Sequence, residues 1–135
     1  MAVDGVRLIV VDAANVVGSR PDGWWRDRSG AARRLLARIP RLRERLSEPA
    51  EVIVVLEGAA KAAVDAADPE PGGVIVVAAD GSGDDAIVEV VAAARAEDGR
   101  RSITVVTADR GLRDRVAALG AEVVGPSRLL DCLES

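Results

Sequence analysis

Histidine is absent from the 135-residue sequence, and cysteine occurs only once, as Cys132. Without imidazoles or a second thiol, the chain cannot build a Ser-His-Asp triad, an internal disulfide, or the usual zinc and iron–sulfur sites. The only aromatic residues are Trp24 and Trp25, so the core must consist of small aliphatic side chains. Any chemistry must therefore rest on carboxylates, Arg, amides, hydroxyls and backbone groups.

Long apolar runs are also missing, because no stretch approaches the roughly 18 apolar residues that can span a membrane. The N-terminal segment carries Asp4 and lacks a basic region, which argues against a signal peptide. Hydrophobic residues make up 49% and charged residues 30%, which is typical of a globular protein. We therefore expect one domain over residues 1–135, no membrane association and a cytoplasmic location.

Charge is distributed unevenly along the chain. The net charge is −4, but residues 20–45 hold nine Arg against three acidic residues, a balance of +6. The rest of the chain, with nine basic and nineteen acidic residues, carries −10. Such a basic block can bind a polyanion, or it can simply form a solvated helix face, and the two interpretations have equal weight.

Five short apolar runs predict strands, and helical spacing recurs between them. The runs lack polar alternation, which is typical of parallel strands covered on both faces. Helices are expected over 35–46, from 82 onward, over 112–119 and over 129–133, with the Ala-rich stretch 59–67 as a further candidate. Pro40 is expected to kink or split the first of these helices. The alternation predicts an α/β fold, a three-layer sandwich with a mostly parallel sheet. The expected strands are Val6–Val11, Val52–Leu56, Val74–Val77, Ile103–Val106 and Glu122–Val124.

Acidic residues follow the predicted strands. Because the carboxyl ends of parallel strands share one edge of the sheet, acids that are distant in the sequence should converge there. Two carboxylates about 5 Å apart repel by roughly 3 kcal/mol at an effective dielectric near 20, and a bound cation would remove that repulsion. Oxygen ligands favour Mg²⁺ or Mn²⁺ over zinc. The acids in question are Asp12, Glu57, Asp80, Asp84, Asp85 and Asp109.

Most of these residues also have a simpler structural interpretation. Asp109 can cap the helix that follows it, and Asp85 can form a capping box with Ser82. Asn15 can cap a turn, and Asp80 is more readily explained as a solvated loop residue. Taken together, however, acids after three or four strand ends favour the ion-binding interpretation.

Three segments resemble the signatures of NYN domains, which are PIN-like nucleases. Residues 10–17 (VVDAANVV) resemble the D-G-x-N-V opening, residues 83–88 (GDDAIV) the paired-acid signature, and residues 105–109 (VVTAD) the V-V-T/S-x-D signature. Residues 23–28 (GWWRDR) further resemble the bacterial YacP-like branch. The chain departs from the family at Ala13, which replaces a Gly, and at Glu57, where an Asp is common.

The resemblance implies a five-stranded PIN-like sheet in the order 3-2-1-4-5. It also implies a metal-dependent endoribonuclease that hydrolyses RNA phosphodiester bonds with metal-activated water. Asp12, Asp109 and either Asp84 or Asp85 would be the catalytic ligands of Mg²⁺ or Mn²⁺. Asn15 would orient Asp12 or contact the scissile phosphate.

Single-stranded RNA is the expected partner. An exposed Trp25 could stack on an unpaired base, although at least one of the two Trp residues is expected to anchor its loop to the core. Arg side chains would hold the flanking phosphates. The candidates are Arg26, Arg28, Arg33, Arg34, Arg110 and Arg113.

Three other functions stay open at this point. The same acids could serve a metal-dependent nucleotide phosphohydrolase, which would not need the basic block. The fold could also be a non-catalytic module that binds RNA or a ribonucleoprotein. Finally, it could be a toxin-type nuclease that is held by a protein partner.

Overall fold

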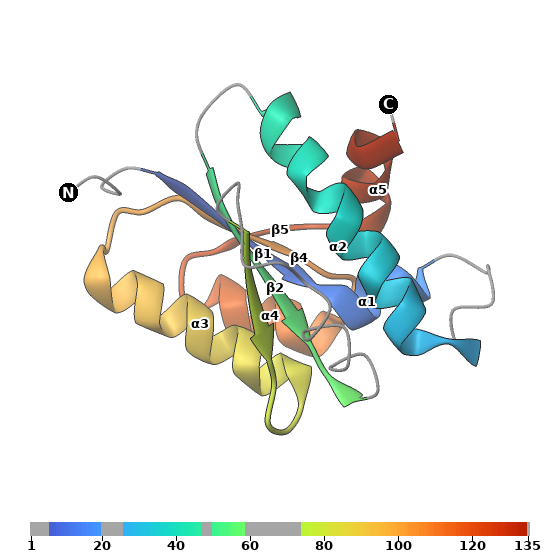
Figure 1. Cartoon of the computed structure of the whole chain (residues 1–135). Coiled ribbons are helices and arrows are strands. Elements are labelled where there is room, and N and C mark those ends of the chain that lie inside the picture. The colour runs from blue at the N-terminus through green and yellow to red at the C-terminus, as the bar shows by residue number, and fades with distance from the viewer. Residues whose placement is uncertain (1–5, 20–25, 47–49, 59–73, 135) are drawn as a thin grey trace.

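The computed structural model describes residues 6–19, 26–46, 50–58 and 74–134. Within these ranges five parallel strands form one sheet in the order β3-β2-β1-β4-β5, with helices on both faces (Figure 1). The predicted α/β fold and strand order are confirmed. The strands are β1 (Arg7–Asp12), β2 (Ala50–Leu56), β3 (Val74–Ala78), β4 (Ile103–Val106) and β5 (Glu122–Val124). The helices are α1 (Ala13–Gly18), α2 (Arg28–Arg45), α3 (Gly83–Glu97), α4 (Arg110–Ala117) and α5 (Pro126–Glu134).

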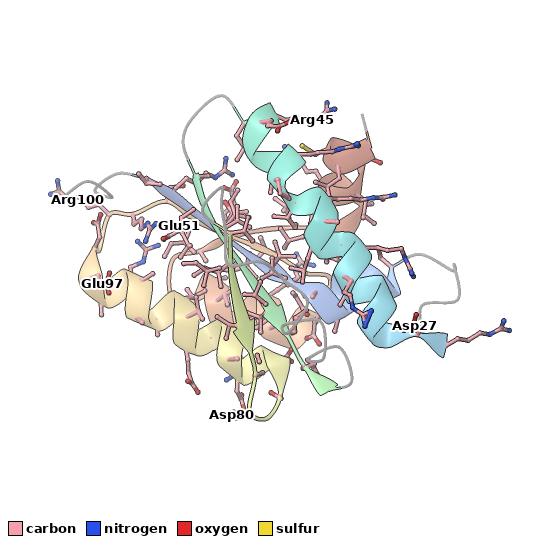
Figure 2. All side chains as sticks on the ribbon, viewed as in Figure 1. Asp27, Arg45, Glu51, Asp80, Glu97 and Arg100 are labelled. Atoms are coloured by element: carbon pink, nitrogen blue, oxygen red, sulfur yellow. The ribbon has the colours of Figure 1, made fainter. Side chains whose placement is uncertain are left out.

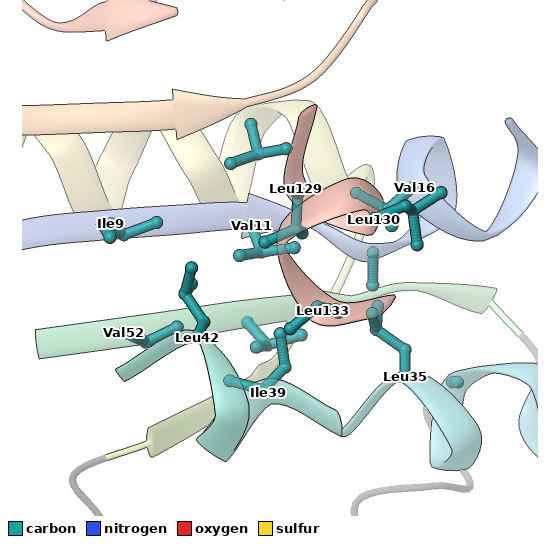
Figure 3. Packing of buried hydrophobic residues seen from close by; sticks show 14 of the residues in the cluster. Ile9, Val11, Val16, Leu35, Ile39, Leu42, Val52, Leu129, Leu130 and Leu133 are labelled. Atoms are coloured by element: carbon teal, nitrogen blue, oxygen red, sulfur yellow. The ribbon is translucent and has the colours of Figure 1, made fainter. Parts of the chain in front are cut away.

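The central strand β1 divides the core between the two faces of the sheet. Ile9 and Val11 pack with residues of α1, α2 and α5, as Figure 3 shows. Leu8 and Val10 point the other way and pack with residues of α3 and α4. All four side chains are buried. Because both faces are covered, the strand needs an unbroken apolar sequence, which explains the absence of polar alternation.

Helix α2 follows the expected apolar stripe. Leu35, Ile39 and Leu42 are buried at helical spacing and belong to the core on that face of the sheet. The helix continues through Pro40, so of the two expected effects, a kink or a split, the split does not occur. Pro40 lies on the exposed side, and buried residues on either side of it hold both halves of the helix against the sheet.

Helix α1 was not predicted from the sequence. It begins directly after β1, where the Asp12 carboxylate caps it by accepting a hydrogen bond from the backbone N–H of Asn15 at 3.3 Å. Only six residues long, the helix is too short for apolar periodicity to reveal. It turns the chain sharply and keeps Asn15 beside the edge of the sheet.

One Arg joins two helix ends on the other face. The Arg95 guanidinium, in the last turn of α3, donates hydrogen bonds to the carbonyl oxygens of Arg101 (2.8 Å), Leu119 (2.9 Å) and Gly120 (3.2 Å). Gly120 has a φ of 83°, a conformation that favours glycine. A Cβ at this position would also lie 3.3 Å from the guanidinium. The Arg95 corner, defined by these four residues, therefore fixes α3 to the turn after α4.

No helix within the described ranges is both long and apolar enough to cross a bilayer. Two sequence predictions, the stacking residue Trp25 and the candidate helix 59–67, fall outside the described residues.

Candidate active site

Carboxylates gather in a cavity of about 320 Å³ at the edge where the strands end. They come from the ends of β1 and β2 and from the starts of α3 and α4. In the described part of the chain, no Arg or Lys lines this cavity. It is lined by Asp12, Ala14, Asn15, Glu57, Ser82, Asp84 and Asp109, and we call it the acidic cavity.

Asp12 is the most enclosed of these acids, with only 4% of its surface exposed. One carboxylate oxygen caps α1, and the other accepts a hydrogen bond from the Thr107 hydroxyl at 2.9 Å. Burial raises the pKa of Asp12, and the negative charges of Asp84 and Glu57 raise it further. The two hydrogen bonds oppose this shift without cancelling it. The site therefore holds a carboxylate whose negative charge is poorly compensated by the protein.

Thr107 connects the two acids that follow the neighbouring strands β1 and β4. Its buried hydroxyl donates to Asp12 and accepts a hydrogen bond from the backbone N–H of Asp109 at 3.1 Å. Asp109 in turn caps α4 by accepting from the N–H of Leu112 at 3.0 Å. The simple capping interpretation of Asp109 is thus confirmed, and the same residue also lines the acidic cavity. Thr107 belongs to the segment that resembles the V-V-T/S-x-D signature, but the sequence alone does not indicate this bridging contact.

Asn15 forms a second link between the same two strand ends. Its side-chain oxygen accepts a hydrogen bond from the backbone N–H of Ala108 at 2.8 Å and does not cap a local turn, which was the simpler of its two interpretations. The hydrogen bond uses the amide oxygen and leaves the amide nitrogen available to donate at the cavity.

Glu57 holds the start of α3. Its Oε1 atom accepts a hydrogen bond from the backbone N–H of Gly83 at 3.0 Å. A Cβ at Gly83 would overlap this oxygen, so the contact needs glycine. The sequence placed Glu57 at the correct edge, but nothing in a single strand end could indicate a contact with a residue 26 positions away.

The paired acids at the start of α3 have different surroundings. Asp84 lines the acidic cavity, and burial, followed by the negative charges of Asp109 and Glu57, raises its pKa. Asp85 lies outside the cavity, where its exposed side chain pairs with Arg115 of α4 at 3.0 Å. Its backbone N–H donates to the Ser82 hydroxyl, which is one of the two contacts of the expected capping box, while its side chain pairs with Arg115.

Asp80, after β3, is exposed and does not line the acidic cavity (Figure 2). Its placement agrees with the loop interpretation. The structure therefore brings together Asp12, Glu57, Asp84 and Asp109, and leaves Asp80 and Asp85 outside.

The donor chemistry of the acidic cavity suits a hard divalent cation. Carboxylate and amide oxygens surround it, and mutual repulsion contributes to the raised pKa values of two of the acids. Among the described residues, no three acidic or thiol side chains are already grouped so that they could hold one ion. Mg²⁺ is usually held by one or two carboxylates together with waters and substrate phosphates, so this arrangement fits such an ion.

The predicted phosphate-binding residues lie on the surface. Arg33 and Arg34 are exposed in the first half of α2, which packs beside α1 (Figure 1). Arg110 and Arg113 are exposed at the start of α4, directly after Asp109. The structure says less about the other predicted RNA-binding residues. Arg26 is exposed, while the side chain of Arg28 and all of Trp25 lie outside the described residues.

The parallel 3-2-1-4-5 sheet with acids at its carboxyl edge defines a PIN-like α/β fold. Comparison with solved structures agrees: a mutant of Rae1 (YacP) from Bacillus subtilis has a similar fold, with a TM-score of 0.74. The alignment covers 96% of this chain and 76% of that chain, at 19% sequence identity. The resemblance to the YacP-like branch is therefore confirmed for the fold. No protein-family model matches the chain, and no curated protein matches it.

Proposed function

We propose that the chain is a metal-dependent endoribonuclease that hydrolyses RNA phosphodiester bonds. The observation that carries this proposal is the acidic cavity, in which four carboxylates meet without a basic residue among its described lining. Such an arrangement is unfavourable for the protein alone, because burial and like charges both raise the pKa of Asp12. A bound cation would relieve the repulsion, which is why we interpret the cavity as a functional site.

Asp12, Asp84 and Asp109 are the proposed ligands of Mg²⁺ or Mn²⁺, one or two of them directly and the others through bound water. When bound, the ion would activate water and neutralise charge on the scissile phosphate. Glu57 is instead a positioning residue, since one of its oxygens is engaged by the N–H of Gly83 and so supports the helix that carries Asp84. Asp109 uses one carboxylate oxygen to cap α4, whereas both Asp12 oxygens accept a hydrogen bond. Asp12 would therefore contact the ion through the remaining lone pairs of these oxygens.

Other residues would orient the substrate. The Asn15 amide nitrogen can donate to a phosphate oxygen, because its amide oxygen is already engaged by Ala108. Thr107 would keep Asp12 and Asp109 in a fixed relation through its two hydrogen bonds. Neither residue needs to transfer a proton, in agreement with a chain that lacks histidine.

RNA is the proposed substrate, and single-stranded RNA in particular. Exposed Arg residues on both sides of the strand edge, such as Arg33 on α2 and Arg110 on α4, would hold phosphates that flank the cleaved bond. Trp25, which precedes α2 in the sequence, would stack on an unpaired base. An RNA substrate of this kind would be cleaved in the cytoplasm, which is the location that we propose for the protein.

The test is cleavage of an end-labelled single-stranded oligoribonucleotide by the full chain in the presence of Mn²⁺. We expect products with a 5′-phosphate and a 3′-hydroxyl. Asp12→Asn should lower the cleavage rate by about 100-fold or more, the effect of several kcal/mol of lost transition-state stabilisation, while RNA binding persists. Hydrolysis of free nucleotides without cleavage of RNA would overturn the proposal in favour of a phosphohydrolase.

The paired acids provide a sharper comparison. Asp84→Asn should reduce cleavage to a degree similar to Asp12→Asn, because Asp84 lines the acidic cavity. Asp85→Asn should have a much smaller effect, since Asp85 pairs with Arg115 outside the cavity. Asp80→Asn, at a strand end but exposed, is the matched control. Equal losses for all three variants would contradict the proposed ligand set.

A non-catalytic RNA-binding module is the second candidate. It is favoured by the absence, among the described residues, of three acidic side chains already grouped for one ion. In that case the wild-type chain and Asp12→Asn would bind RNA equally, and neither would cleave it.

A further inference from the structure

A second cavity, of about 210 Å³, lies between α2, α5 and the sheet face formed by β1, β4 and β5. It shares no lining residue with the acidic cavity. We propose that this cavity binds a small carboxylate with an aliphatic body. The proposal does not depend on nuclease activity, and we call this site the α2/α5 cavity.

The walls of the α2/α5 cavity are aliphatic. Leu42 comes from α2, Leu46 directly follows that helix, Leu129 comes from α5, and Ile9 comes from β1, which forms the floor. Figure 3 shows Leu42, Leu129 and Ile9. No aromatic ring lines the cavity in the described structure, so it offers no stacking surface for a base. The cavity is also smaller than the roughly 300–1,000 Å³ of pockets for drug-sized ligands, which indicates a small aliphatic occupant.

Arg7 is an unusual residue for this floor. It begins β1 and lies on the same face as the buried Ile9, where a guanidinium meets apolar surroundings. One terminal nitrogen donates to the buried Thr104 hydroxyl at 3.0 Å. The Nε atom is fully buried, yet it has no hydrogen-bond acceptor among the residues that the structure describes. Leaving such a donor unsatisfied costs about 1–3 kcal/mol. Because Nε itself is enclosed by protein, a ligand in the cavity would meet the terminal nitrogens of the Arg7 guanidinium.

The charge around the α2/α5 cavity favours an anion. Two guanidinium groups, those of Arg7 and Arg128, and one carboxylate, that of Glu122, line it, a local balance of +1. In the described part of the chain, the side chains of Arg128 and Glu122 form no ion pair or hydrogen bond. A carboxylate can accept two hydrogen bonds from one guanidinium, and its aliphatic body would contact the leucines.

Cys132 provides a built-in reporter, because it is the only cysteine and lines the α2/α5 cavity. The experiment measures the rate at which methyl methanethiosulfonate, a small neutral reagent, modifies this thiol in the full chain. Hexanoate should slow the modification in a saturable manner, whereas hexanol should protect at least about tenfold less well and hexylammonium should not protect. A tenfold ratio corresponds to a charge-assisted hydrogen bond of about 1.4 kcal/mol.

Two variants complete the test. Arg7→Gln should weaken protection by hexanoate by about tenfold, while Arg100→Gln, which removes an exposed guanidinium outside the cavity, should leave it unchanged. If Arg7→Gln fails to fold, Leu46→Trp, which should fill the cavity from its rim, must abolish the protection instead. Equal protection by hexanoate and hexanol, no protection by either, or an unchanged response in the variants would overturn the proposal.

Discussion

Asp12 is held where its charged form is disfavoured, and this has a direct consequence for stability. Its pKa in the folded protein is raised above the ordinary value of 3.8, mainly by burial. Between these two values the folded state binds more protons than the unfolded state. The free energy of unfolding therefore falls as the pH rises through this window, and the full penalty is present above it.

We therefore predict that Asp12→Asn is more stable than the wild type at pH 7 without divalent ions. Asn keeps an oxygen for the N–H of Asn15, and its amide can donate to the Thr107 hydroxyl oxygen. The difference should shrink as the pH is lowered through the raised pKa of Asp12 to its ordinary value of 3.8, because the wild-type carboxyl is then protonated as well. Urea unfolding at pH 7 and at the lower pH measures the difference in the free energy of unfolding between the variant and the wild type. Asp114→Asn, at an exposed position, is the control. A variant less stable than the wild type at pH 7 would contradict this account.

At the scale of elements, the contact between Glu57 and Gly83 joins the end of β2 to the start of α3. We predict that Gly83→Ala lowers the free energy of unfolding by about 1–3 kcal/mol, because the new Cβ displaces the Glu57 carboxylate. In a Glu57→Ala background the same change should be neutral or slightly stabilising, since Ala is the better helix former.

Denaturant unfolding of the four proteins in this double-mutant cycle gives the coupling energy. Gly111→Ala in α4 is the matched control, because its Cβ would lie 3.4 Å from Asp109 Oδ1, an ordinary contact. If Gly83→Ala lowers the free energy of unfolding equally in both backgrounds, the Glu57 carboxylate is not what makes a Cβ at position 83 unfavourable.

Pro40 gives a second prediction at this scale. It lies exposed inside α2 and cannot donate the backbone hydrogen bond that a helix interior requires. Pro40→Ala should raise the stability by about 1–2 kcal/mol, less than the full helix penalty because proline also restricts the unfolded chain. Thermal unfolding should show no such rise in stability for Pro126→Ala, because Pro126 lies at the first position of α5, where proline is tolerated. A destabilised Pro40→Ala would mean that α2 depends on the local geometry of proline.

The strands could be predicted because each contains a short apolar run, and the two covered faces of β1 require apolar residues over Leu8–Val11. Helix α1 could not, since its existence depends on the Asp12 cap and not on periodicity. A kink or a split was expected at Pro40, and the split does not occur because buried contacts on either side outweigh a lost hydrogen bond. Local patterns thus predicted the elements that the core requires, but they missed α1, which depends on a polar cap, and the continuity of α2, which depends on packing.

For the whole molecule, the convergence of distant acids makes stability depend on divalent ions. We predict that millimolar Mn²⁺ raises the Tm of the wild type and that a chelator reverses the shift. An ion present at about 100 times its Kd would add about 2.7 kcal/mol to the free energy of unfolding. Asp84→Asn should show a much smaller shift, and Asp80→Asn should respond like the wild type. An unchanged Tm in the wild type would indicate that the acidic cavity holds no such ion.

The sheet topology explains which features of the acidic cavity could be predicted from the sequence. Asp12 and Asp109 follow adjacent strands, so the sheet order alone brings them to one edge. The different surroundings of Asp84 and Asp85 depend on the rotation of α3, which is set by Glu57 and Arg115 from other elements. The hydrogen bond from Thr107 to Asp12 likewise exists only after β1 and β4 are assembled.

The Arg95 corner makes the opposite side of the molecule depend on a single side chain. Besides the carbonyl oxygens of Arg101, Leu119 and Gly120, the guanidinium donates to those of Asp98 and Gly99, so it has five acceptors in all. Because every acceptor belongs to the main chain, exchanging the side chains of these five residues removes none of the acceptor atoms. Loss of the Arg95 side chain, by contrast, would remove all five hydrogen bonds at once and free α3 from the turn after α4.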